Sequence, residues 1–276
     1  MRLTTKIVLG IIISIFLLSF GIIVTLLFNA KRDNIERFYT SSPRILQENI
    51  IPVDIEPYKT IWIDETDRTS NNNIYPAGSL LLKPAIKEED KNKLFLPEEL
   101  LPFTTIISSN DTLIIRLKME KLCEKYAPKS GSGHTICSLQ NVNFFLHSNT
   151  VDVICNVQGI KVDVQNIKTD HIKINTCGEI NIESCQAKRI EPYTRNSWNK
   201  FMLKNSQVEE LNIDLDAMHN WQIENCDIEV ENRTGSGHHR ADLPKGAAKI
   251  VNWIPKNKDA RLEVTLYGDT ARVVFQ

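Results

Sequence analysis

The sequence has little glycine and proline, with 11 of each in 276 residues. This excludes collagen-like chains and the Gly/Ser-rich disordered class. It also has no large excess of charge, with 33 Lys and Arg against 34 Asp and Glu. Four of the basic residues lie in the first 32 positions, so the remainder carries 29 positive and 34 negative charges, a net of −5. Because a nucleic-acid binder needs a basic surface, we exclude nucleic acid as a partner.

The sequence also lacks the common catalytic and metal-binding motifs. Its six cysteines, at positions 123, 137, 155, 177, 185 and 226, form no CxxC pair, so neither a zinc site nor a thioredoxin motif is indicated. It contains no GxSxG, HExxH, Walker loop or GxGxxG motif. We therefore predict no cofactor, no metal and no catalytic residue, and we lean against an enzyme.

A single long apolar run lies near the N-terminus, where Ile7 to Phe28 contains no charged residue. As a helix it would span about 33 Å, the thickness of a hydrocarbon core. We predict an uncleaved transmembrane helix with the lipid bilayer as partner; a cleaved signal peptide is the alternative. Since only six residues precede it and about 240 follow, we expect a periplasmic domain on a bacterial inner membrane. A cytoplasmic domain on a reversed anchor is the alternative.

The composition after this run changes along the chain, with seven of the eleven prolines before residue 103. Proline removes a backbone donor, so we expect short strands with irregular connections there. We divide the chain into a short cytoplasmic tail (1–6), a transmembrane helix (7–28), a juxtamembrane linker (29–47), a Pro-rich β subdomain (48–126), β-solenoid repeats (127–232), a loop (233–249) and a C-terminal β-hairpin cap (250–276).

Residues 139–232 contain an irregular repeat of about 20 residues. Each copy has an apolar residue, then Asn or Ser two positions later, then a small or apolar residue. The copies begin at Leu139, Val164, Ile182, Leu203 and Ile223, and the polar position falls on Asn141, Asn166, Ser184, Asn205 and Asn225. We predict that this column lies at a bend.

A 20-residue period with no helical pattern is typical of stacked coils. We therefore predict a mainly β protein, a right-handed parallel β-solenoid with a C-terminal hairpin, preceded by one transmembrane helix. An antiparallel β-sandwich is the alternative. We also predict a hairpin within 104–119, turning at Ser109, Asn110 and Asp111.

The candidate contact residues are histidines and acids near predicted turns. Asp214 and Asp216 share one strand face, about 6–7 Å apart between Cα atoms, and His219 follows them. Asp163, Asp170 and His171 could lie on neighbouring coils. Two matching Gly-Ser-Gly-His loops supply His134 and His238, the second followed by His239. We interpret His134, Asp214, Asp216, His219, His238 and His239 as a contact surface. Solvated strand acids and ordinary loop residues are the simpler interpretation.

Four segments carry a family resemblance: Lys59-Thr-Ile-Trp-Ile-Asp64, Leu100-Leu-Pro-Phe103, Asn110 to Leu117, and the short strands of Val151–Ile182. In rhythm, over roughly residues 55–230, they resemble the head GIN domains of bacterial auto-transporter adhesins. Gly178-Glu-Ile-Asn181 is the nearest match to the Gly-Ile-Asn tripeptide. The resemblance implies an exported β-solenoid with an adhesive or structural role, and it brings no catalytic residues.

From these observations we predict a membrane-anchored cell-envelope module, adhesin-like and non-catalytic, that binds an envelope protein or glycan. One alternative is a polysaccharide lyase or glycoside hydrolase using Asp214, Asp216 and their neighbours. Another is a self-assembling envelope scaffold.

Overall fold

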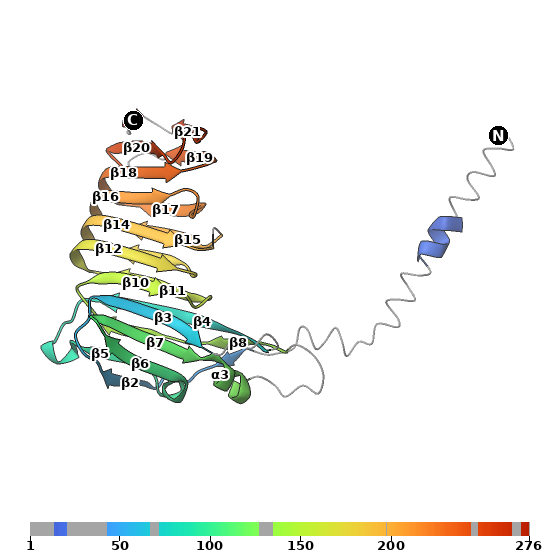
Figure 1. Ribbon diagram of the computed structural model, residues 1–276, viewed down its shortest axis with the longest axis vertical. Coiled ribbons are helices and arrows are strands. Elements are labelled where there is room, and N and C mark those ends of the chain that lie inside the picture. The colour runs from blue at the N-terminus through green and yellow to red at the C-terminus, as the bar shows by residue number, and fades with distance from the viewer. Residues whose placement is uncertain are drawn as a thin grey trace. The chain divides into compact units, whose positions relative to one another are not determined.

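The computed structural model describes residues 14–20, 43–66, 72–126, 135–196, 198–243, 248–266 and 272–275. Contacts divide the chain into two compact units, residues 1–42 and 43–276. In the second unit two ten-stranded sheets lie face to face, and a two-stranded sheet lies near the C-terminal end (Figure 1).

The strands are short, and most are separated by a single turn. The first sheet contains, in spatial order, β17 (Asn220–Glu224), β15 (Lys200–Lys204), β13 (Ile180–Glu183), β11 (Ile160–Gln165), β4 (Asn72–Lys83), β9 (Phe144–His147), β5 (Lys93–Pro97) and β2 (Ile50–Asp54), with β8 (Thr135–Gln140) and β1 (Arg44–Ile45) joined beside β4. The second sheet contains β22 (Arg272–Phe275), β20 (Ile250–Pro255), β18 (Asp227–Gly235), β16 (Gln207–Asp214), β14 (Gln186–Thr194), β12 (Lys168–Thr176), β10 (Val151–Cys155), β3 (Thr60–Thr66), β7 (Thr112–Lys118) and β6 (Thr104–Ser109). The third pairs β19 (His238–Leu243) with β21 (Arg261–Leu266), and the helices of this unit are η1 (Glu88–Asp90), η2 (Glu98–Phe103) and α3 (Met119–Tyr126).

From β10 to β18 consecutive strands alternate between the two sheets, so each strand pairs with the one two places ahead. In the first sheet Val164 pairs with Ile182, Ile182 with Leu203, and Leu203 with Ile223. These are the starting positions of four of the five copies of the sequence repeat, so the register of those copies is confirmed. The first copy is not in this register, because Leu139 pairs with Pro76 of β4 whereas Val164 pairs with Leu82. Inward residues of successive strands form buried aliphatic columns between the sheets.

The predicted bend after each repeat is also confirmed. Asn141, Asn166, Ser184, Asn205 and Asn225 all have positive φ, between 49° and 63°. Asparagine tolerates this left-handed region better than most residues. A hydrogen bond of 3.4 Å from Asn225 Nδ2 to Asn205 Oδ1 runs along the column. The last four of these turns take the chain from the first sheet into the second, whereas the turn at Asn141 joins β8 to β9 within the first sheet.

The predicted fold class is corrected in its pairing, its layering and its C-terminal end. Antiparallel pairing joins β2 to β5, β5 to β9 and β6 to β7, while the other strand pairs in the described ranges are parallel. The sheets are therefore mixed, and their arrangement is sandwich-like rather than a parallel solenoid. The same pairing excludes an antiparallel sandwich.

The C-terminal hairpin is wrong as well, because β21 pairs in parallel with β19 and β22 with β20. Alternation between sheets separates β21 from β22, so they cannot pair with each other. The hairpin predicted at Ser109–Asp111 is confirmed by antiparallel β6 and β7, with positive φ at Asn110 and Asp111.

The predicted transmembrane helix is also corrected. Of residues 7–28 the structure describes 14–20, which are helical. Among the helices in the described ranges, none is both long and apolar enough to cross a bilayer. The tail at 1–6 and the remainder of the N-terminal unit lie outside the described residues.

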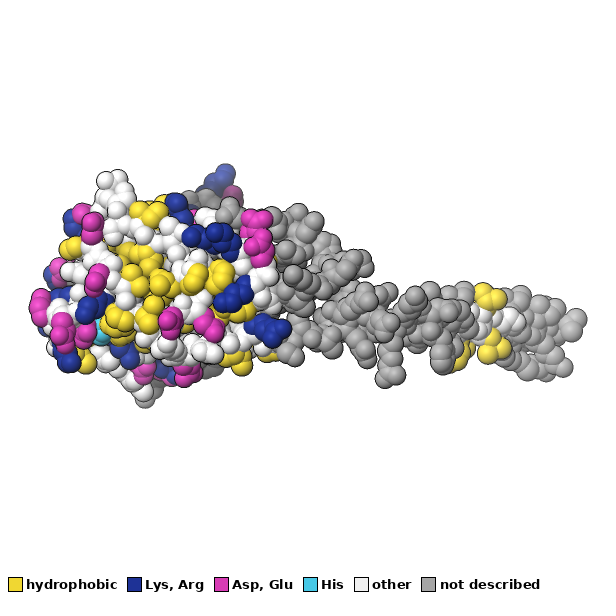
Figure 2. Space-filling model, turned by 90° about the horizontal axis from the view of Figure 1, so that it is seen from below, with side chains coloured by type: hydrophobic (Ala, Val, Ile, Leu, Met, Phe, Trp, Pro, Cys, Tyr) yellow, Lys and Arg dark blue, Asp and Glu magenta, His cyan; other side chains and the backbone are white. Residues whose placement is uncertain are grey.

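The edge strands β2 and β6 close one end of the two large sheets. Figure 2 views the molecule from below and shows hydrophobic side chains gathered among charged ones. Ile50 of β2 and Ile107 of β6 are among the exposed aliphatic residues. Pro52 removes one N–H from the β2 edge, which reduces its capacity to pair with another strand.

Near the opposite end, an ion pair replaces two aliphatic residues inside the core. The register aligns Leu211 with Glu231 and Ile213 with Arg233. Glu231 and Arg233 are 0% and 1% exposed, and Arg233 Nε lies 2.8 Å from Glu231 Oε1. The guanidinium lies over the ring of Trp221, 5.3 Å from its centroid. Glu231 Oε2 and Arg233 Nη1 have no hydrogen-bond partner, so the desolvation of this pair is only partly compensated.

The left-handed turn at Ser184 predicts a stabilising substitution. Because asparagine tolerates positive φ better than serine, Ser184→Asn should raise the free energy of unfolding by about 0.5 kcal/mol. Ser184→Val should lower it by about 1–2 kcal/mol. Urea unfolding would measure both, with the neighbouring exposed Glu183→Asn as control. A Ser184→Val variant as stable as the wild type would contradict the assignment.

The buried pair predicts a non-additive result. Arg233→Ile alone should cost about 3–5 kcal/mol, because it leaves Glu231 as an unpaired buried charge. The double change Glu231→Leu/Arg233→Ile copies Leu211 and Ile213 of the preceding strand. It should restore stability to the wild-type level or above. Urea unfolding of the wild type, Arg233→Ile, Glu231→Leu and the double variant checks this, and a double variant no more stable than Arg233→Ile would refute it.

Candidate functional site

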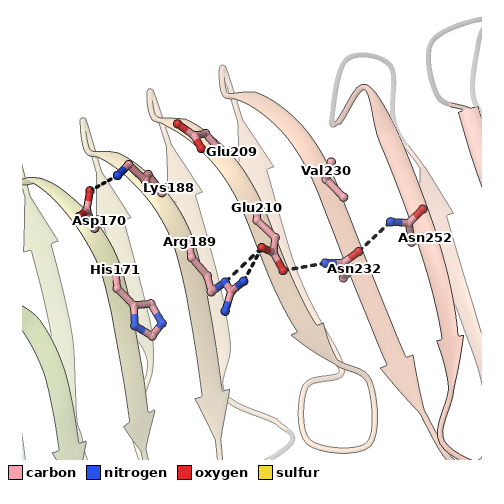
Figure 3. Close-up of a pocket in the computed structure, with 9 residues that line it drawn as sticks. All are labelled: Asp170, His171, Lys188, Arg189, Glu209, Glu210, Val230, Asn232 and Asn252. Carbon is pink, nitrogen blue, oxygen red and sulfur yellow. Dashed lines mark hydrogen bonds and ion pairs between the residues drawn. The ribbon is translucent and has the colours of Figure 1, made fainter.

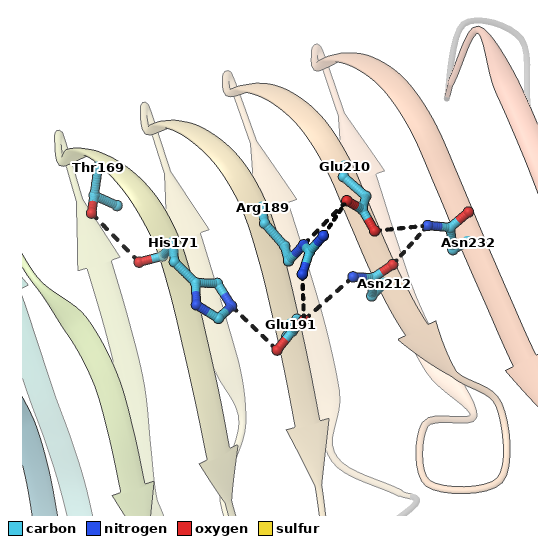
Figure 4. Close-up of polar contacts among 7 residues, drawn as sticks. All are labelled: Thr169, His171, Arg189, Glu191, Glu210, Asn212 and Asn232. Atoms are coloured by element: carbon cyan, nitrogen blue, oxygen red, sulfur yellow. Dashed lines mark hydrogen bonds and ion pairs between the residues drawn. The ribbon is translucent and has the colours of Figure 1, made fainter.

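The outer face of the second sheet carries a continuous group of polar side chains. Side chains alternate along a strand, so those between buried positions point to solvent. The parallel register then places His171 beside Arg189, and Arg189 beside Glu210. We use the term polar strip for the following seven residues of β12, β14, β16, β18 and β20, drawn in Figures 3 and 4: His171, Arg189, Glu191, Glu210, Asn212, Asn232 and Asn252.

The charged part of the polar strip is a chain of ion pairs (Figure 4). Arg189 donates through Nε and Nη2 to Glu210 Oε2, at 3.1 and 2.8 Å. Its Nη1 lies 3.9 Å from Glu191 Oε1, and His171 Nε2 lies 3.2 Å from Glu191 Oε2. Arg189 therefore lies between two carboxylates on neighbouring strands, which fixes the position of its guanidinium.

The amide part continues the polar strip toward the C-terminal end. Asn252 Nδ2 donates to Asn232 Oδ1 at 2.8 Å, and Asn232 Nδ2 donates to Asn212 Oδ1 at 2.9 Å. Asn232 Nδ2 also donates to Glu210 Oε1 at 3.0 Å, which joins the amides to the ion pairs. Asn212 Nδ2 reaches Glu191 Oε1 at 3.5 Å. The network orients each amide before any ligand arrives.

These contacts change the ionisation of Glu210. Partial burial alone would raise the pKa of its carboxyl group, but hydrogen bonds from Arg189, Asn212 and Asn232 and the charge of Arg189 outweigh burial. The pKa of Glu210 therefore lies below its ordinary value. Glu210 is an anion at neutral pH, and its charge is matched by Arg189.

Two hollows run across this face. One, of about 610 Å³, is lined by most of the polar strip together with Asp170, Lys188, Glu209 and Val230 (Figure 3). The other, of about 520 Å³, shares Asp170, Lys188 and Glu209 with it. Because the two hollows share these lining residues, they form one continuous groove across β12 to β18, long enough for an extended ligand.

The structure brings together three of the residues predicted as a contact surface. Asp216 Oδ1 lies 2.9 Å from His239 Nε2. Lys256 Nζ donates to Asp214 Oδ1 at 2.6 Å and to Asp216 Oδ2 at 2.9 Å. The backbone amide of Ser236 also donates to Asp216 Oδ1, at 2.9 Å. These bonds connect the turn after β16 to Ser236, which follows β18, to His239 of β19, and to Lys256, which follows β20.

This arrangement does not suit Asp216 for acid catalysis. Partial burial alone would raise the pKa of Asp216, but hydrogen bonds from Ser236, Lys256 and His239 outweigh it and hold the pKa well below its ordinary value. A glycosidase acid needs the opposite, a raised pKa. Asp214 and Asp216 therefore have the contacts of a structural clamp.

The remaining predicted contact residues are not brought to this cluster. His219 is exposed in the segment between β16 and β17, and His238 is exposed at the start of β19. His134 lies outside the described residues. Sequence reasoning named His171 but missed Arg189, Glu191 and Glu210. The available signal was the spacing of exactly one repeat, 20 residues, between Asn212, Asn232 and Asn252.

Comparison with known proteins gave no family model and no curated protein that matches this sequence. Solved structures do align. A putative adhesin from Bacteroides fragilis aligns with 83% of this chain and 99% of its own, at 11% identity and a TM-score of 0.40. A putative adhesin from Parabacteroides distasonis aligns with 85% of this chain and 100% of its own, at 12% identity and a TM-score of 0.34.

A putative lipid binding protein from Parabacteroides distasonis aligns with 84% of this chain and 100% of its own, at 12% identity and a TM-score of 0.41. The names of these chains show neither an auto-transporter nor a GIN domain. Since all three TM-scores are below 0.5, the function of this chain is argued from its own residues.

The lowered pKa of Glu210 predicts a pH-dependent contribution to stability. A carboxylate whose folded pKa lies below its unfolded value, about 4.3, stabilises the fold above that value and loses this effect as pH falls through the folded pKa. Glu210→Gln should therefore cost about 1 kcal/mol at neutral pH, with a smaller difference from wild type at about pH 3.

Urea unfolding at both pH values would measure this difference. Glu209→Gln, an adjacent exposed residue, is the matched control and should show little difference at either pH. A Glu210→Gln deficit that stays constant between the two pH values would contradict the ion-pair assignment.

Proposed function

We propose that this chain is a non-catalytic binding module of the cell envelope, and that the polar strip holds an extended polar ligand. The observation that carries the proposal is the continuous groove formed by the two adjoining hollows on the outer face of the second sheet. Each successive strand contributes side chains to the lining of this groove. The lining therefore repeats from strand to strand along the sheet, as an extended ligand would require.

The chemistry of the polar strip supports binding rather than turnover. Its carboxylates are paired with Arg189 and His171, and its amides are hydrogen-bonded to one another. Groups held in this way pay little conformational entropy when a ligand binds.

The cell location is part of the proposal. The uncharged apolar run at residues 7–28 is of the kind that directs a chain to export. We place the β domain outside the cytoplasm, where it would meet envelope proteins and glycans. The adhesin-like role is of the kind that the names of the aligned chains state.

The proposed function predicts that Arg189→Ala weakens the binding of the chain to isolated cell envelopes. Arg189 is the residue that joins both carboxylates of the polar strip, so its loss should reduce the affinity of the full chain for isolated cell envelopes of the source organism by about 10-fold. Cosedimentation at a series of protein concentrations would give the affinity. Arg261→Ala, an exposed arginine on β21, is the control and should bind as the wild type does. Equal binding by Arg189→Ala would reject the polar strip as the binding face.

A further inference from the structure

A smaller hollow of about 340 Å³ lies beside the polar strip and shares Glu191 and Asn212 with it. Four strands line it, β12, β14, β16 and β18. Its polar lining includes Asn175, Asp214 and Thr234, and its apolar lining includes Pro192 and Tyr193. It therefore combines an apolar surface with hydrogen-bonding groups around it, within the size range of small-molecule sites.

Tyr193 is the aromatic residue of this hollow, and it is 39% exposed. Exposed aromatic rings with polar neighbours offer a flat apolar surface to a partner that is apolar on one side and polar at its rim. Tyr193 pairs with Asn175 on the neighbouring strand. Asn175 Oδ1 is buried and has no hydrogen-bond partner, so it is not part of the accessible surface of the hollow.

The charges in the hollow limit the class of ligand. Glu191 lies 3.9 Å from Arg189, Asp214 is paired with Lys256, and Lys173 also lines the hollow. Since both carboxylates already have cations, the site offers acceptors for hydroxyl groups without a strong demand for a cationic ligand. A pyranose ring fits this chemistry, because it has an apolar face of C–H groups and a rim of hydroxyls.

We propose that the Tyr193 hollow seats one pyranose unit of a glycan whose chain continues along the polar strip. This inference rests on the proposed function and specifies its ligand class. The sugar's C–H face stacks on Tyr193, and its hydroxyls bond Glu191 and Asn212.

The test compares variants of the full chain for binding to isolated envelopes of the source organism. Tyr193→Ala should weaken binding by about 10-fold, and Tyr193→Phe, which keeps the ring, should stay within about 3-fold of wild type. Tyr75→Ala is the matched control, because Tyr75 is also a strand tyrosine, 40% exposed, but belongs to the first sheet. It should bind as the wild type does. Thermal unfolding would confirm that the variants are folded.

Treating the envelopes identifies the ligand class. Binding should be lost after metaperiodate, which cleaves vicinal diols of sugars, and should survive digestion with proteinase K. Binding that survives metaperiodate but is lost after proteinase K would overturn the glycan assignment. So would a folded Tyr193→Ala variant that binds as tightly as wild type. If Arg189→Ala still weakens binding in either case, the polar strip remains the binding face; if it does not, the proposed function fails too.

Discussion

The β domain depends on one backbone constraint, the left-handed residue that follows each of β8, β11, β13, β15 and β17. At Asn141, Asn166, Ser184, Asn205 and Asn225 the chain enters a region of φ that most side chains avoid. The last four of these turns send the chain into the opposite sheet, whereas the turn at Asn141 leads to β9 in the same sheet. Because the turn recurs about every 20 residues, the next strand returns in register beside its predecessor. Asparagine at four of the five positions lowers the cost of a conformation on which the strand order depends.

Register then determines what the surface can do. Once alternate residues are fixed inward by the aliphatic columns, the outward residues of successive strands must lie side by side. Asn212, Asn232 and Asn252 become a hydrogen-bonded row for this reason alone. Arg189 meets Glu210 by the same rule, across 21 residues of sequence. The polar strip is thus a product of the repeat, and a slip of one residue would bury it.

The repeat and its bend could be predicted from sequence because both are local signals, an apolar start followed two residues later by Asn or Ser. The pairing of β19, β21 and β22 could not, since alternating residues in Leu262–Leu266 suit a hairpin as well as parallel strands. The polar strip was missed for a related reason. Acids and histidines near turns are visible in the sequence, whereas Arg189 and Glu210 lie within strands and come together only when the copies of the repeat are aligned. The buried Glu231 and Arg233 were hidden too, because an alternating charged pair in a strand normally indicates solvent exposure.

Two ion pairs of this domain, Glu231 with Arg233 and Arg189 with Glu210, are stabilised in opposite ways. The difference between them separates structure from function. Glu231 and Arg233 are sealed in the core with one donor and one acceptor unsatisfied, so no ligand can reach them and their charges act on the fold alone. Arg189 and Glu210 are half-exposed on the sheet face, at 50% and 31%, and are bonded to each other. Water competes with that pair, so its contribution to stability is limited to about 1 kcal/mol. A partly exposed network that holds its groups in fixed positions across several strands suits the proposed binding role, because a ligand can use the orientation without having to create it.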